Sequence, residues 1–187
     1  MSKPITTEVD GTSPALPGGP PRAQFRRTSR TLADGREVIY FDDTPDAVPR
    51  TTLDPRPLGA RAAAGHIRYD ALVGDWVAIA GHRMNRTFLP PKDQCPLCPA
   101  ARAPGSEIPD RDYDVVVFEN RFPSLTSESP SQFPTSNGDG FVSAPGHGSC
   151  ELICFCSNHT GSFAELQPSH ARLVVDAWRH RTAELMT

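Results

Sequence analysis

Two cysteines separated by two residues, Cys95 and Cys98, form the most specific chemical pattern in the sequence. Thiolates at this spacing can bind one tetrahedral zinc ion, and the Pro-rich segment around them is typical of a metal-binding knuckle. A redox pair and two buried small side chains are the alternative interpretations. The residues just before the pair, Lys92, Asp93 and Gln94, are polar, and neither alternative is suggested by such a flanking sequence.

A structural zinc site takes about four ligands, so further donors are needed. His159 is the third candidate, because it follows a segment that we expect to be a strand, and a strand end could deliver its ring to the knuckle. Cys154 and Cys156 share one face of that strand, and burial in the core is the simpler interpretation of both. His147 and Cys150 could also complete a site, although nothing in their spacing favours them.

Two arginines, Arg83 and Arg86, form a second pattern just after another predicted strand. Guanidinium groups at a strand end could converge on phosphate oxygens through bidentate hydrogen bonds, and a solvated charged loop is the alternative. The segment Phe118-Glu-Asn-Arg-Phe122 also has two interpretations, because an amide between two aromatic rings could bind a base or cap a strand.

Composition favours a single folded domain with a loose tail. The 187 residues include 20 Pro and 14 Gly, and the 37% that are hydrophobic suffice for one core. A formal net charge of -3 excludes the strongly basic field of a general nucleic-acid-binding protein. No apolar stretch approaches the roughly 20 residues of a membrane span, and the first residues lack the apolar core of a signal peptide. We therefore expect a cytoplasmic protein with neither nucleic acid nor membrane as partner.

The N-terminal third contains the least regular part of the sequence. Residues 1–27 are rich in Pro, Gly, Ser and Thr, and this composition predicts a disordered tail. Residues 28–65 predict a hairpin followed by a Pro-bearing linker extension. The Asp34-Gly35 pair predicts a type I′ turn in that hairpin.

The remaining segments predict strands and one helix. We expect strands over residues 66–69, 76–80, 114–118 and 151–156, and a long functional loop over residues 123–145. A helix is expected from Pro168 to about Leu185. Its predicted sheet-facing side chains are Leu173, Val174, Ala177, Trp178 and Leu185. The pattern as a whole predicts an α+β fold, an antiparallel sheet with a flanking C-terminal helix, and no nucleophile motif is recognisable in it.

Six segments, taken in order, resemble galactose-1-phosphate uridylyltransferases. They are residues 68–77, 81–86, 95–98, 117–125, 150–159 and 175–185. The resemblance covers about residues 66–187 and corresponds to the N-terminal half of that family. It implies half of a histidine-triad-like fold and a uridylyltransferase N-terminal domain over residues 66–187.

The resemblance also implies the chemistry. The family exchanges a uridylyl group between UDP-glucose and galactose 1-phosphate in galactose metabolism, through a uridylyl-histidine. The nucleophile is the second His of a His-Pro-His motif, and these 187 residues do not contain that motif. We therefore expect a domain truncated before the motif and inactive alone. The implied partner is a complementary C-terminal half chain or a second copy in a homodimer.

Family motifs imply roles for individual residues. Cys95, Cys98 and His159 match three zinc ligands, and the fourth is the first His of His-Pro-His. The residues that match the family's substrate-binding positions are Arg83 and Arg86 near the nucleotide phosphates, Phe118, Asn120 and Phe122 around uracil and ribose, and Leu97 in the nucleotide pocket.

The sequence departs from the family pattern at two positions. Arg121 stands where an Asp is frequent, and it adds positive charge where a ribose hydroxyl acceptor could lie. Asn158 stands where an Asp is frequent before the His, which would alter the orientation of His159 if that carboxylate holds the ring. The alternative functions are a non-catalytic zinc-binding or nucleotide-binding remnant, and a related nucleotidyltransferase or phosphorylase of the same fold.

Overall fold

A computed structural model describes residues 25–59, 65–81, 90–127, 135–136 and 141–186. The chain forms two compact units. Unit 1 comprises Met1–Leu58, Leu89–Phe118 and Ile153–Thr187, and unit 2 comprises Gly59–Phe88 and Glu119–Leu152. Antiparallel strand pairs and one C-terminal helix confirm the predicted α+β class.

The first sheet contains four strands in the order β1-β2-β5-β8. These are β1 (Arg26–Thr31), β2 (Glu37–Asp42), β5 (Val115–Glu119) and β8 (Glu151–Cys154). The run of β-branched residues that opens β5 suits a strand buried on both faces. The strands lie close to the expected positions, although β1 begins slightly before the predicted hairpin and β8 ends before Cys156.

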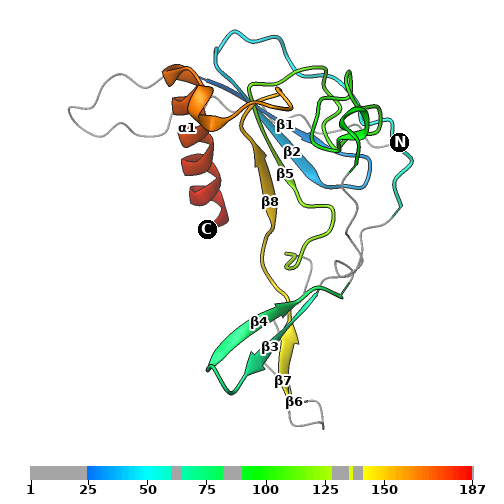
Figure 1. Cartoon of the computed structure of the whole chain (residues 1–187), viewed down its shortest axis with the longest axis vertical. Helices are drawn as coiled ribbons and strands as arrows, with labels where there is room; N and C mark the ends of the chain where they lie inside the picture. Colours follow the sequence, from blue (N-terminus) through cyan, green and yellow to red (C-terminus); the bar gives the residue numbers. More distant parts are fainter. Residues whose placement is uncertain (1–24, 60–64, 82–89, 128–134, 137–140, 187) are drawn as a thin grey trace, which may run out of the picture. The chain divides into compact units, whose positions relative to one another are not determined.

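Helix α1 (Pro168–Leu185) packs against this sheet and forms the core of unit 1 (Figure 1). Pro168 occupies the first turn, where its missing amide hydrogen has no partner to lose. Alternate residues of β2 and β5 point to the helix, as the two-residue period of a strand requires. The buried residues of this cluster are Ile39, Phe41, Val115, Val117, Leu173, Val174 and Ala177.

The buried face of α1 differs from the predicted one at its edges. Trp178 and Leu185 are 46% and 49% exposed, so the prediction that they face the sheet is wrong. Trp178 instead stacks on Phe163, with 6.1 Å between the ring centroids. Asp176 is buried on the same helix, and its carboxylate lies 3.6 Å from Arg172 Nε one turn earlier. This ion pair makes the burial of the carboxylate tolerable.

The loop between β1 and β2 is wider than the predicted type I′ turn. Such a turn needs positive φ at both central residues, but among the described residues only glycines, including Gly35 at φ +86°, adopt positive φ. The Leu32 amide donates to the Arg36 carbonyl (2.8 Å), and the Gly35 amide donates to the Leu32 carbonyl (3.0 Å). The resulting three-residue loop places Asp34 Oδ2 at 2.7 Å from Arg36 Nε.

The second sheet lies in unit 2 and has the order β4-β3-β7-β6. Its strands are β3 (His66–Asp70), β4 (Asp75–Ile79), β6 (Thr135–Ser136) and β7 (Val142–Pro145). The prediction that residues 123–145 form one long loop is therefore wrong for β6 and β7. Strand β7 pairs with β3 over only a few residues, which is too short a run for periodicity to reveal.

The predicted tail and linker are only partly described. Residues 1–24, which make up most of the predicted tail, lie outside the described residues. The segment after β2 runs without a helix or strand to Gly59, and its part up to Leu58 belongs to unit 1. Within the described ranges, the helices are too short or too polar to cross a membrane.

The core between α1 and the first sheet generates a stability prediction. Leu173 is 1% exposed within this cluster, so Leu173→Ala should leave a cavity and lower the free energy of unfolding by about 2–5 kcal/mol. Val175, on the same helix, is 50% exposed, and Val175→Ala should change it by less than about 0.5 kcal/mol. Urea unfolding of both variants measures the difference. Equal losses would contradict the packing described for α1.

Candidate metal centre

The knuckle, residues 95–98, follows a short 3₁₀ helix, η2 (Lys92–Gln94). The Cys98 amide donates to the Cys95 carbonyl (3.4 Å), which closes a turn between the two cysteines. Cys98 is buried and Cys95 is half-buried, and neither forms a disulfide. The turn therefore holds two free thiols on the same side of one short loop.

The segment after the knuckle folds back and braces it. The Glu107 amide donates to the Pro96 carbonyl (2.8 Å), and the Ala100 amide donates to the Ile108 carbonyl (3.0 Å). Tyr113 adds a third bond, from its hydroxyl to the carbonyl of Leu97 (3.2 Å). The backbone carbonyls between the cysteines are thus fixed from outside the knuckle.

His159 reaches the knuckle from the loop after β8. Its Nδ1 lies 3.1 Å from Cys98 Sγ, and the ligand atoms of Cys95, Cys98 and His159 all lie within 4.8 Å of one another. Arg102, just beyond the knuckle, donates from Nη1 to the Ser157 carbonyl (2.7 Å) and so ties the two loops together. The structure therefore gathers the three metal ligands that the sequence predicts.

The donor set of this cluster fits a metal ion. Two thiols and an imidazole are the ligands of tetrahedral sites for borderline-soft metals. Burial raises the pKa of the Cys98 thiol, and the neighbouring Cys95 raises it further. A metal ion would displace the protons of both thiols on binding, so affinity should fall as pH falls.

Asn158 does not orient the ring of His159 through its side chain. Its Oδ1 accepts from the amide of Thr160 (3.3 Å), which makes a local turn. The Cys156 thiol donates to the Asn158 carbonyl (3.6 Å), and the Gly161 amide donates to the same carbonyl (3.1 Å). The loop that carries His159 is therefore shaped by its own polar groups.

The other cysteines lie beside the cluster or away from it. Cys154 and Cys156 line an open pocket of about 390 Å³ together with the three candidate ligands. Burial raises the pKa of the Cys154 thiol to about 11, so this thiol is protonated at neutral pH. Among the described residues, the group within 4.8 Å includes neither of these cysteines, nor His147 or Cys150.

The predicted nucleotide-binding residues are distributed over both units. Arg83 and Arg86 lie outside the described residues. Leu97 is 37% exposed within the knuckle and lines the same pocket. Phe118 is only 2% exposed, on the face of β5 opposite Val117.

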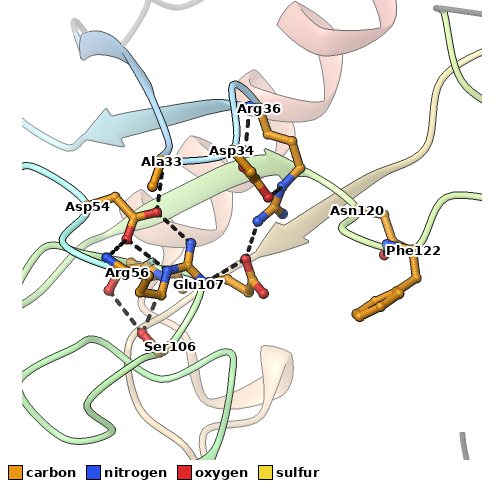
Figure 2. Close-up of polar contacts among 10 residues, drawn as sticks. Ala33, Asp34, Arg36, Asp54, Arg56, Ser106, Glu107, Asn120 and Phe122 are labelled. Atoms are coloured by element: carbon orange, nitrogen blue, oxygen red, sulfur yellow. Dashed lines mark hydrogen bonds and ion pairs between the residues drawn. The ribbon is translucent and has the colours of Figure 1, made fainter. Parts of the chain in front are cut away.

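Asn120 and Phe122 belong to a tight turn in unit 2. The Phe122 amide donates to Asn120 Oδ1 (3.0 Å), as Figure 2 shows, and the Asn120 amide donates to the Cys150 carbonyl (2.8 Å). The Arg121 guanidinium lies over the Phe122 ring, 5.6 Å from its centroid. Since the turn uses the oxygen of Asn120, its Nδ2 group is the part of the side chain suited to donate to a ligand.

Sequence reasoning missed the residues that support the knuckle. Tyr113, Arg102 and Glu107 carry no motif, and the ion-pair partner of Glu107, Arg36, is 71 positions away in the chain. A buried Arg in an otherwise ordinary hairpin loop has no signature in one sequence. These residues become visible only when the fold brings their segments together.

Comparisons with known proteins show the family of the chain. Residues 56–187 match the family described as galactose-1-phosphate uridyl transferase, N-terminal domain. A galactose-1-phosphate uridylyltransferase of Streptomyces lividans is 46% identical over 161 residues, which are 86% of this chain and 40% of the relative. The relative of the same name from Thermotoga maritima is 31% identical over 119 residues, 64% of this chain and 36% of that protein. The one from Rattus norvegicus is 33% identical over 133 residues, 64% of this chain and 35% of that protein.

The chain spans 35% to 40% of the length of these three relatives. No solved structure gives a significant match. The family match covers most of the chain and includes both segments that form the cysteine and histidine cluster. The chain therefore belongs to the galactose-1-phosphate uridylyltransferase family and carries its N-terminal domain.

Proposed function

We propose that this chain supplies the N-terminal part of an enzyme that transfers a uridylyl group between UDP-glucose and galactose 1-phosphate. The observation that carries the proposal is the match of residues 56–187 to the N-terminal domain of the family. A histidine nitrogen attacks the α-phosphorus of UDP-glucose, and the bond to the bridging oxygen breaks to release glucose 1-phosphate. A phosphate oxygen of galactose 1-phosphate then displaces the histidine and forms UDP-galactose.

The nucleophilic histidine of this proposal lies on polypeptide outside these 187 residues, because they contain no His-Pro-His motif. The C-terminal region that the relatives possess beyond their match is the natural source. This region would complete the site together with these residues, whereas a second copy of the same 187 residues would lack the motif as well. All five cysteines are free thiols, which supports a reducing compartment, and we place the enzyme in the cytoplasm.

Zinc is the metal that the cluster of Cys95, Cys98 and His159 suits best. Zinc prefers thiolate and imidazole donors in tetrahedral geometry. Its contribution would be structural, since it would fix the knuckle to the loop after β8. A fourth ligand from the C-terminal region would close the site, and a closed site binds zinc more tightly than one with three protein ligands.

The substrate contacts are assigned by family motif and by exposure. The Nδ2 group of Asn120 and the ring of Phe122 are suited to a base or ribose, and Leu97 offers apolar surface beside the knuckle. Arg83 and Arg86 are the proposed phosphate ligands. Because Phe118 is buried, we assign it the support of β5 rather than contact with the nucleotide.

The metal proposal predicts about one zinc ion per chain when the protein is prepared in reducing, zinc-replete buffer. The Cys95→Ser variant should lose the bound zinc, because the substitution removes one of the three clustered donors. Cys150→Ser is the matched control, since Cys150 is a half-buried free cysteine outside the cluster, and it should retain the zinc. Elemental analysis after gel filtration measures both. Zinc absent from the unmodified chain would refute the metal site.

The catalytic proposal predicts that the chain alone does not consume UDP-glucose in the presence of galactose 1-phosphate. Co-expression with the C-terminal region of the Streptomyces lividans relative should produce UDP-galactose, because that region would provide the missing nucleophile. The nucleotide-sugar products are separated and measured by ion-exchange chromatography.

Three outcomes would count against this proposal. Turnover by the chain alone would show that the nucleophile lies within these residues. Uridine nucleotide binding without turnover in any co-expressed complex would instead favour a non-catalytic remnant. Preferential binding of an ADP-sugar over UDP-glucose would favour a related nucleotidyltransferase or phosphorylase.

A further inference from the structure

Glu107 lies at the centre of a buried ion-pair network in unit 1 (Figure 2). Its Oε2 is 2.5 Å from Arg36 Nη2 and 2.9 Å from Arg56 Nη1. Each arginine also has its own aspartate: Arg36 Nε lies 2.7 Å from Asp34 Oδ2, and Arg56 Nη2 lies 2.7 Å from Asp54 Oδ2. Three carboxylates and two guanidiniums therefore form one connected cluster.

The members of this network are held in fixed positions. The Arg36 side chain is completely buried, and that of Arg56 is 8% exposed. Burial acts to raise the pKa of Asp54, but hydrogen bonds from Arg56 and from the Ala33 amide (3.1 Å) outweigh it and keep the pKa below its usual range. A carboxylate that stays ionised in this setting keeps Arg56 aimed at Glu107.

The backbone of Glu107 connects this network to the metal centre. Its amide donates to the carbonyl of Pro96, which lies between Cys95 and Cys98. The adjacent Ser106 Oγ bonds both the amide (3.2 Å) and the carbonyl (3.1 Å) of Ile108, so the chain around Glu107 has little freedom. The side chain and the amide of one residue thus join the N-terminal segment to the knuckle.

We propose that Glu107 is a positioning residue for the metal centre, and that Arg36 and Arg56 act through it. The inference rests on the proposed metal site. The two arginines fix the carboxylate, the carboxylate fixes the backbone of Glu107, and its amide fixes the turn that presents the two thiols. Groups that hold ligands without binding the metal commonly change metal affinity by about 10–100-fold when they are removed.

Asp110 provides the matched control. It is a buried carboxylate in the same segment, 7% exposed, and Thr52 Oγ1 donates to its Oδ1 (2.7 Å). Thr52 belongs to the connector after β2 and not to the knuckle. Asp110→Asn should therefore lower the stability of the fold, because it removes a buried, hydrogen-bonded carboxylate. It should leave the turn between the cysteines undisturbed.

The experiment titrates the full chain with Co²⁺ and follows the thiolate-to-cobalt absorption bands. Glu107→Gln should weaken Co²⁺ binding about tenfold or more and alter the bands, because the thiols are no longer held in one geometry. Glu107→Asp keeps the charge and should recover part of the affinity. Asp110→Asn should bind within about twofold of the unmodified chain and leave the bands unchanged.

The inference is overturned if Glu107→Gln binds Co²⁺ as tightly as the unmodified chain, or if Asp110→Asn loses as much affinity as Glu107→Gln. If Glu107→Gln does not fold, Arg56→Gln decides, since it keeps the Arg36 pair with Glu107 and should weaken binding by a smaller factor. Failure of the unmodified chain to bind any metal would refute the proposed metal site instead. In that case amide hydrogen exchange tests the positioning role. The amides of residues 96–108 should exchange faster in Glu107→Gln than in the unmodified chain, and should not do so in Asp110→Asn. Unchanged exchange rates in Glu107→Gln would overturn the positioning role.

Discussion

The Arg36 guanidinium is completely buried, and a charge in that position must be neutralised by neighbours that the fold cannot move. Asp34 from the same hairpin loop and Glu107 from a distant segment meet this requirement. The hairpin, the connector that carries Arg56 and the segment after the knuckle are therefore fixed to one another by charge rather than by apolar packing alone. Removing one partner of such a buried pair is strongly unfavourable, because it leaves an uncompensated charge.

The candidate metal centre depends on two separate supports. The knuckle is braced from one side by the Glu107 amide and the Tyr113 hydroxyl, while Arg102 anchors the loop of His159. Phe155, just after β8 and before the loop of His159, packs against the core between the first sheet and α1. Because each donor sits on a loop, its position reflects the elements behind it, and the hydrogen bonds to the loop backbone are as important as the donors themselves.

Periodicity and residue type predicted most strands and α1 near their observed limits, since each rests on local sequence. The Cys95–Cys98 pair is also a local pattern, whereas His159 was predicted because it follows a strand and matches a family ligand. Two predictions failed because contacts with distant segments determine the observed structure. Trp178 turns outward because Phe163 offers it a stacking partner, and β7 forms because β3 lies beside it. Neither Phe163 nor β3 is adjacent in the sequence to the element it contacts, so no local pattern contains these contacts. The type I′ turn is a local failure, because Asp34 does not adopt the positive φ that this turn needs.

The short distance between Cys98 and His159 joins two points that lie 61 positions apart in the chain. A metal ion that bridges them would act as a reversible cross-link, comparable to a disulfide in its effect on the unfolded chain. Closing a loop of that length removes conformational entropy equivalent to about 4 kcal/mol on the chain-entropy estimate. Metal availability in the cell would then set how much of this domain is folded, and so couple the supply of an ion to the amount of enzyme.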